Sequence, residues 1–149
     1  MSSFRAIVLL ASLVTATAVS GQMNRKPVTP SIDPDVKATA AFAEVALKRT
    51  DFEADLEALL IDYTGEFPKV KELKYALTRI EAESARLSAI KPAERGRATS
   101  ALGKLMVRKV EAEIDLWKLQ SAYADTHPEV LRAKKKVDIY EKAIKEILG

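Results

Sequence analysis

The sequence predicts an all-α protein in which a duplicated antiparallel helical hairpin forms an elongated four-helix bundle or a coiled-coil-like assembly. Three observations predict this class. Apolar residues recur at alternating spacings of three and four, the period of one helix face. Residues 37–89 align without gaps with residues 97–149 and share 12 identities in 53 pairs, which indicates an internal duplication. A similar helix break stands at the equivalent place in both copies.

The N-terminal residues 1–21 have the pattern of a secretory signal peptide. Arg5 is the only charged residue among them, an apolar stretch follows it, and small residues fill positions 16–21. The apolar stretch is shorter than the ~20 residues that span a bilayer. We therefore expect a periplasmic or secreted protein, and an uncut N-terminal membrane anchor is the alternative.

A proline-containing linker follows, and after it the composition changes. Residues 22–33 contain Pro27 and Pro30 and few apolar side chains, which predicts a flexible linker. The rest of the chain is rich in Ala, Leu, Lys and Glu, which are good helix formers. We expect one hairpin over 34–90 and a second over 91–149, with helices at 34–63, 68–90, 96–124 and 128–148.

Each hairpin is expected to turn at a break that contains a proline. Pro68 and Pro128 suit the first turn of a helix, because the N–H that proline lacks would be unpaired there. Gly65 and Asp125 tolerate the left-handed conformation that ends many helices. So short a break favours antiparallel helices, and a kinked continuous helix is the alternative. The predicted turn residues are Tyr63, Gly65, Pro68, Tyr123, Asp125, His127 and Pro128.

Folding each hairpin at its break brings a basic residue opposite an acidic one. Arg49 then faces Glu81, and Lys109 faces Glu141. Exposed pairs of this kind contribute only ~0.2–1 kcal/mol, so we expect them mainly to set the register of the helices. The alternative is that Arg49 and Lys109 extend into solvent.

The composition argues against an enzyme, a metal site and a bound cofactor. The chain has no cysteine and one histidine, His127, which excludes disulfides and thiolate zinc sites. Alternate carboxylates in the acidic runs 51–57 and 111–115 diverge around a helix, so we expect both runs to form solvated faces. We predict a non-enzymatic protein without a cofactor or a metal.

The second hairpin carries an additional apolar stripe at positions that are mostly polar in the first. One interpretation is that this stripe packs against the first hairpin as a second layer. The other is an exposed surface for a protein partner or a second copy, centred on Trp117. The candidate partner-binding residues are Val110, Ile114, Trp117, Leu131 and Ile139.

The last predicted helix carries a basic cluster. Its residues are Arg132, Lys134, Lys135 and Lys136. Such a cluster suits an anionic polysaccharide or lipid headgroups, and a solvated helix face is the alternative. The formal charge of +3 is weak evidence for an anionic partner, and the secretory leader argues against nucleic acid as that partner.

The two breaks resemble one known junction. Tyr123, His127, Pro128 and Val130 match the Tyr-x-x-x-His-Pro-x-Val junction in the coiled-coil region of bacterial polysaccharide chain-length regulators, whereas the first break has Phe67 in place of histidine. The two membrane-spanning helices of those regulators have no counterpart in the sequence. The resemblance implies a helical scaffold in the bacterial envelope.

Together these features predict an exported, non-enzymatic scaffold, adaptor or chaperone-like protein-binding module of the bacterial envelope. The alternative is a peripheral binder of anionic glycan or lipid through the basic face of the last helix.

Overall fold

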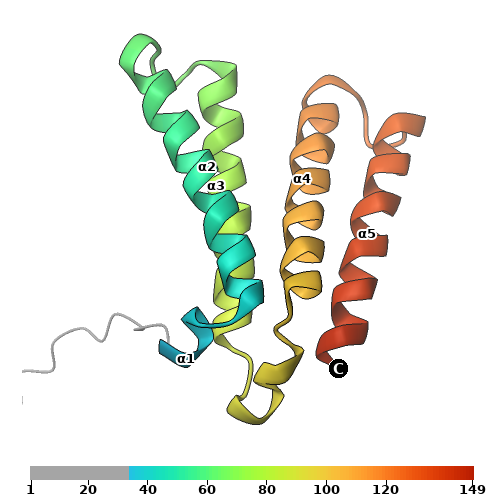
Figure 1. The fold of residues 1–149 in the computed structure, drawn as a ribbon. Coiled ribbons are helices and arrows are strands. Elements are labelled where there is room, and N and C mark those ends of the chain that lie inside the picture. The colour runs from blue at the N-terminus through green and yellow to red at the C-terminus, as the bar shows by residue number, and fades with distance from the viewer. Residues whose placement is uncertain (1–33) are drawn as a thin grey trace, which may run out of the picture. The chain divides into compact units, whose positions relative to one another are not determined.

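Helices make up all the regular structure of residues 34–149, the part of the chain that the computed structural model describes (Figure 1). The predicted signal peptide, 1–21, and the predicted linker, 22–33, lie outside the described residues. The all-α fold class is confirmed. The elements are α1 (Pro34–Lys37), α2 (Ala40–Asp62), α3 (Pro68–Ser88), the 3-10 helix η1 (Pro92–Arg97), α4 (Ser100–Ala122) and α5 (Pro128–Leu148).

The two hairpins repeat each other residue for residue. α4 begins and ends 60 positions after α2, and α5 begins and ends 60 positions after α3. Their first helices also start in the same way. The Thr39 hydroxyl accepts a hydrogen bond from the Phe42 N–H at 3.3 Å, and Thr99 accepts one from Leu102 at 3.4 Å. Each threonine thus satisfies one of the free N–H groups at a helix start.

Two helix boundaries differ from the expectation. The helix expected from residue 34 is interrupted, because Thr39 leaves the helical conformation to cap α2 and its hydroxyl donates to the Val36 carbonyl at 2.8 Å. The helix expected from residue 96 begins instead at Ser100. Residues Pro92–Arg97 form η1, and Thr99 provides the cap.

Both hairpins are antiparallel, so the kinked-helix alternative is wrong (Figure 1). Tyr63 and Tyr123 leave the preceding helix in an extended conformation, with ψ of 150° and 153°. The Tyr63 ring stacks on Phe67 at 4.1 Å between centroids, and the Tyr123 ring stacks on His127 at 4.3 Å. Each stack closes one hairpin tip.

The expected left-handed helix end at Gly65 is wrong. Gly65 has no positive φ. The helix ends earlier, because Tyr63 is already extended while its N–H still donates to the Leu59 carbonyl at 2.9 Å. Pro68 and Pro128 do occupy the first position of α3 and α5, as predicted.

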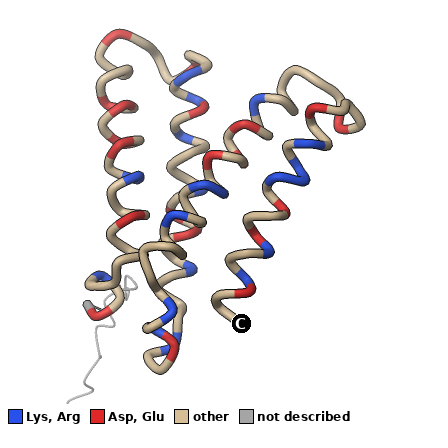
Figure 2. Tube along the Cα trace, turned by 45° about the vertical axis from the view of Figure 1, so that its right-hand side comes forward, with Lys and Arg blue, Asp and Glu red and all other residues tan. Residues whose placement is uncertain are grey.

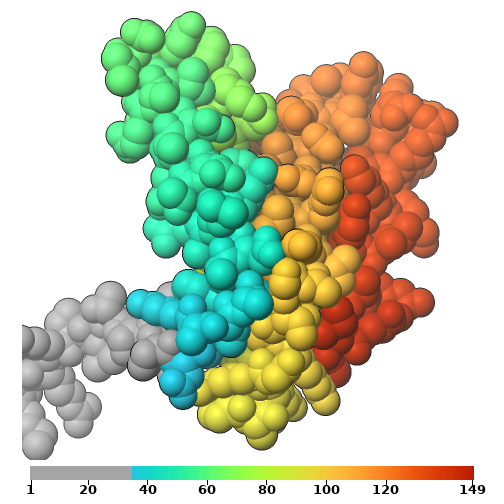
Figure 3. Space-filling view, in the orientation of Figure 1, coloured from blue at the N-terminus to red at the C-terminus, as the bar shows by residue number. Residues whose placement is uncertain are grey.

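α4 is the central helix of the described residues. α2 packs on α3 and α4 packs on α5 within each hairpin, while α2 and α3 both also pack on α4. The tips of both hairpins lie at the same end (Figure 1), and the hairpins diverge toward those tips (Figure 3). The largest fully buried side chains are Val36, Val45, Val70, Ile80, Leu87, Leu102, Met106, Val110, Val130 and Ile144.

A glycine allows α2 and α4 to approach closely near their N-termini. A Cβ atom on Gly103 would lie 2.7 Å from the Ala41 carbonyl oxygen and 2.8 Å from the Ala41 Cα. The Ala41 N–H, one of the free donors of the first turn of α2, reaches the Ala98 carbonyl at 3.2 Å. This end of the first hairpin is therefore tied directly to the start of the second.

Candidate functional site

A groove lies between the tip of the first hairpin and the C-terminal part of α4. It has a volume of about 610 Å³, and its apolar lining comes from Phe67, Pro68 and Trp117. Lys69 and Lys118 also line it. The groove exists because the turn places Phe67 immediately before α3, close to the last turns of α4.

Trp117, the only tryptophan of the chain, connects this groove to the core. Its indole is half-buried and stacks on the Tyr75 ring at 5.3 Å between centroids and 16° between planes. Burial of Tyr75 raises the pKa of its phenol. Trp117 is therefore held against α3 and also forms one wall of the groove.

Exposed apolar side chains gather at the two hairpin tips. Ile61 is 83% exposed, near the end of α2. Of the seven large hydrophobic residues that are exposed in the described part of the chain, only Leu47 and Ile139 lie away from the tips. The other five are Leu60, Ile61, Tyr63, Tyr123 and Leu131.

The predicted partner-binding residues separate into two groups. Val110 and Ile114 lie in the core, where the first hairpin covers them, so their assignment to a partner surface is wrong and the second-layer interpretation applies to them. Leu131 and Ile139 are 52% and 58% exposed. Trp117 contributes to both the internal packing and the groove.

Starting at the groove, α3 and α4 are joined by four side-chain pairs that succeed one another along the antiparallel helices. We call them the α3–α4 ladder. The Tyr75–Trp117 pair is stacked and the Arg79–Glu113 pair is bidentate. The Glu83–Lys109 pair is buried. The pairs are Glu72–Lys118, Tyr75–Trp117, Arg79–Glu113 and Glu83–Lys109.

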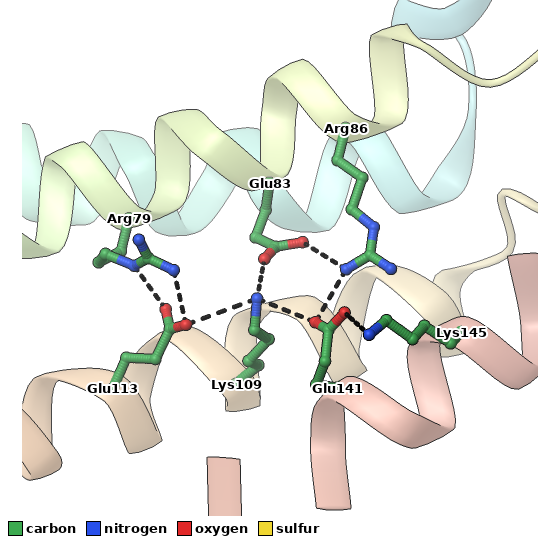
Figure 4. Close-up of polar contacts among 7 residues, drawn as sticks. All are labelled: Arg79, Glu83, Arg86, Lys109, Glu113, Glu141 and Lys145. Atoms are coloured by element: carbon green, nitrogen blue, oxygen red, sulfur yellow. Dashed lines mark hydrogen bonds and ion pairs between the residues drawn. The ribbon is translucent and has the colours of Figure 1, made fainter. Parts of the chain in front are cut away.

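Lys109 is the hub of a buried ionic network (Figure 4). Its Nζ lies 2.6 Å from an oxygen of Glu83, 3.1 Å from Glu141 and 3.5 Å from Glu113. Burial alone would lower the Lys109 pKa, but the hydrogen bond and charge of Glu83, with the charge of Glu113, outweigh burial and raise it. Lys109 is thus held as a cation inside the protein.

Arg79 and Glu113 form a two-point ion pair next to Lys109. Arg79 Nε and Nη2 donate to the two Glu113 carboxylate oxygens at 2.8 and 2.7 Å. This hydrogen bonding raises the Arg79 pKa. Glu113 is only 7% exposed, so the expectation of a solvated face is wrong for this residue, because α3 covers that side of α4.

Glu141 links α5 to the network. Burial would raise its pKa, but hydrogen bonds from Lys109 and Arg86 outweigh burial and lower it to about 2. The Arg86 contact measures 2.9 Å, and Lys145 lies 3.4 Å from the other carboxylate oxygen. α3, α4 and α5 therefore meet at this carboxylate (Figure 4).

Both predicted cross-hairpin pairs are present, but their environments differ. Arg49 lies 3.9 Å from Glu81 and 2.7 Å from Glu53, with its side chain 47% exposed. Lys109, at the equivalent position, pairs with Glu141 while buried. The expectation of a surface pair is therefore wrong for Lys109, since the first hairpin covers the second on this side.

The predicted basic cluster is partly neutralised. Arg132 is paired with Glu129, and Lys134 Nζ lies 2.9 Å from the Asp125 carboxylate. In the part of the chain that the structure describes, Lys135 and Lys136 are exposed and form no ion pair.

The predicted turn residue Asp125 stabilises the second tip. Its carboxylate accepts hydrogen bonds from Gln120 and Lys134, each at 2.9 Å, and these lower its pKa. His127 caps α5, since its Nδ1 accepts from the Glu129 N–H at 3.3 Å. Asp125 and His127 therefore serve the turn in the structure.

The fold and these contacts define a protein of two repeated helical hairpins joined by a buried ionic network, with an apolar groove at one tip. Residues 34–149 hold no group of three or more side chains placed to bind a metal ion. None of the helices within the same residues is long and apolar enough to cross a bilayer. The chain matches no protein-family model, no curated protein and no solved structure.

Proposed function

We propose that the chain is a non-enzymatic, exported protein-binding module whose tip groove takes an apolar segment of a partner protein. The observation that carries this proposal is the groove itself. Phe67, Pro68 and Trp117 line it. Five of the seven exposed large hydrophobic residues in the described part of the chain belong to the two tips, which lie at the same end (Figure 1). Its place in the bacterial envelope rests on the leader sequence and the junction resemblance.

Burial of apolar surface is the interaction that such a groove offers. Each Å² of apolar surface removed from water contributes roughly 25 cal/mol, and aromatic side chains in partly formed pockets are frequent centres of protein interfaces. The flanking lysines are largely paired already. Lys71 lies 2.6 Å from Glu66, and Lys69 lies 2.8 Å from Glu72. We therefore expect apolar contact, rather than charge, to provide most of the binding energy for the partner segment.

Anionic glycan or lipid headgroups are less well supported as ligands. Arg132 and Lys134 are engaged by Glu129 and Asp125, which leaves Lys135 and Lys136 as the unpaired cations of the predicted cluster. Two exposed lysines form a weak anion site on their own.

Peptide selection on the whole protein tests the proposal, with Trp117 emission as the readout. We expect a random peptide library displayed on phage to yield peptides rich in Leu, Phe and Trp. A selected peptide should shift the Trp117 emission, and high salt should leave its affinity unchanged because screening affects charge pairs and not apolar contacts. Selection of acidic peptides, or of none, would contradict the proposal.

The duplication offers a matched pair of variants for this experiment. Phe67→His introduces the residue that the second hairpin uses at the same place, so stacking on Tyr63 should persist. Loss of the apolar contact, about 1–2 kcal/mol, should weaken peptide binding about five- to thirtyfold. The control His127→Phe should leave the affinity unchanged. Equal effects of both substitutions would place the peptide elsewhere.

A further inference from the structure

Equivalent sides of α2 and α4 differ in exposure. The first hairpin covers one side of α4, whereas the equivalent side of α2 is exposed. The covered residues of α4 are Gly103, Val107, Val110, Ile114 and Trp117, all buried or half-buried. Their equivalents 60 positions earlier are exposed, namely Ala43, Leu47, Thr50, Ala54 and Glu57. With Asp51, which precedes Glu111 by 60 positions, we call these residues the outer α2 face.

The surface of the first hairpin that covers α4 also has an equivalent on the second hairpin, and that equivalent surface is exposed. Its residues in α2 and α3 include Lys48, Glu72, Tyr75 and Arg79, which contact Glu111, Lys118, Trp117 and Glu113 of α4. The equivalents on the second hairpin are exposed, namely Arg108, Arg132, Lys135 and Ile139. We call them the outer α5 face.

The two hairpins therefore contact each other through different surfaces, as in a head-to-tail interface. A two-fold relation would bury the same positions on both hairpins, which is not observed. A head-to-tail contact leaves one half of the interface unused at each end, so it can be repeated by further copies.

We propose that the outer α2 face of one copy of the chain packs on the outer α5 face of another, repeating the contact between the hairpins. The charges of the two faces are complementary. Lys48 lies 3.0 Å from Glu111 within the chain, and the repeated contact places Arg108 against Asp51 of the second copy. In the same way, Lys135 would face Glu57 of the second copy. Figure 2 shows the acidic residues along α2 and the basic residues on α5.

The exposed apolar residues support the same contact. Leu47 and Ile139 are 63% and 58% exposed, and they are the two exposed large hydrophobic residues outside the tips in the described part of the chain. One lies on each outer face, so the contact would cover both.

The repeated contact differs from the internal one at most of its positions. For example, Ile139 would face Glu53 of the second copy, where Arg79 pairs with Glu113 inside the chain. Ala43 stands where α4 has Gly103, so the helices cannot approach as closely. Glu146 would face Glu81 of the second copy, because these are the equivalents of Arg86 and Glu141. We therefore expect an association that is reversible and sensitive to salt, since its ion pairs are at the rim.

Sedimentation velocity of the whole protein over a range of concentrations tests this proposal. The mean mass should rise with concentration at low salt and fall when salt is added. A protein that stays monomeric at low salt up to the highest soluble concentration would overturn the proposal.

Charge-reversed variants test which faces meet. Arg108→Glu with Lys135→Glu makes the outer α5 face acidic, and Asp51→Lys with Glu57→Lys makes the outer α2 face basic. Each double variant alone should lose self-association about tenfold or more. An equimolar mixture of the two should recover it, because each altered face then meets its complement.

Two controls complete the design. Lys74→Glu with Lys91→Glu changes the net charge by the same amount as the double variant of the outer α5 face, at exposed sites outside both faces, and should leave association unchanged. Phe67→His should also leave it unchanged, which separates this contact from the proposed peptide groove. If the mixture stays dissociated while circular dichroism shows both variants folded, the head-to-tail contact is wrong.

Discussion

At the residue scale, the duplication shows that position in a repeat does not determine environment. Lys109 and Arg49 occupy the same place in their hairpins, and each pairs with an acid across its hairpin. Lys109 is 8% exposed and contacts three carboxylates, while Arg49 remains at the surface. The difference arises because α3 covers the second hairpin and nothing in the described chain covers the equivalent side of the first.

Removal of the buried cation should therefore cost far more than removal of its exposed equivalent. Lys109→Met leaves Glu83 and Glu113 without this cation in the interior, so the free energy of unfolding should fall by about 3–5 kcal/mol. Arg49→Met should lower it by about 0–1 kcal/mol. Urea denaturation measures both, and similar losses would show that the network is not buried in solution.

The low pKa of Glu141 predicts a stability change in acid. The folded-state pKa of about 2 lies below the ordinary value of 4.5, so the ionised carboxylate stabilises the folded state above about pH 4.5. This stabilisation is lost as the pH falls from about 4.5 towards 2. In Glu141→Gln the free energy of unfolding should be lower at pH 7 and should fall less over that range. Urea denaturation at several pH values measures this difference. An equal fall in the free energy of unfolding for both proteins across this range would contradict the low pKa of Glu141.

At the element scale, local sequence signals predicted the helices and their breaks well. Pro68 and Pro128 mark the start of α3 and α5, and the period of apolar residues predicts the antiparallel hairpins. The helix ends were less predictable. Gly65 suits a left-handed cap, but the extended Tyr63, stacked on Phe67, ends the helix first.

The α3–α4 ladder could not be predicted in the same way. Arg79, Glu83 and Arg86 lie on one side of α3 at spacings of four and three, which marks a charged stripe but not its partner. Periodicity within a hairpin identifies its inner seam. It contains no information on which outer side meets the other hairpin. The sequence alone therefore predicts a solvated Glu113 and does not decide whether Val110 packs against the first hairpin or binds a partner.

The close approach of α2 and α4 should make Gly103 intolerant of a side chain. Gly103→Ala gains about 1 kcal/mol of helix propensity, but its Cβ would overlap the Ala41 backbone, which cannot move without separating the helices. We expect a net loss of ~1–2 kcal/mol in the free energy of unfolding. Gly96→Ala is the control, since nothing lies within 4 Å of its Cβ position. A stabilised Gly103→Ala protein would show that the helices are farther apart.

At the scale of the whole described molecule, the two hairpins form one unit rather than two. The described residues, 34–149, make a single compact unit, in which α4 packs on α2, α3 and α5. The apolar residues that distinguish α4 from α2, such as Val110 and Ile114, are those that the first hairpin covers. Divergence between the repeats thus allows one hairpin to cover the other, and leaves the outer α2 and outer α5 faces exposed.

The central claim is that α3 of the first hairpin covers the charged side of α4, and a double-mutant cycle on Arg79 and Glu113 tests it most directly. The two residues belong to different hairpins and meet only in this packing. Arg79→Gln, Glu113→Gln and the double variant would be compared with the unmodified protein by urea denaturation. We predict a coupling energy of about 1.5–3 kcal/mol for this partly buried, bidentate pair. Additive losses, with a coupling energy near zero, would contradict the account.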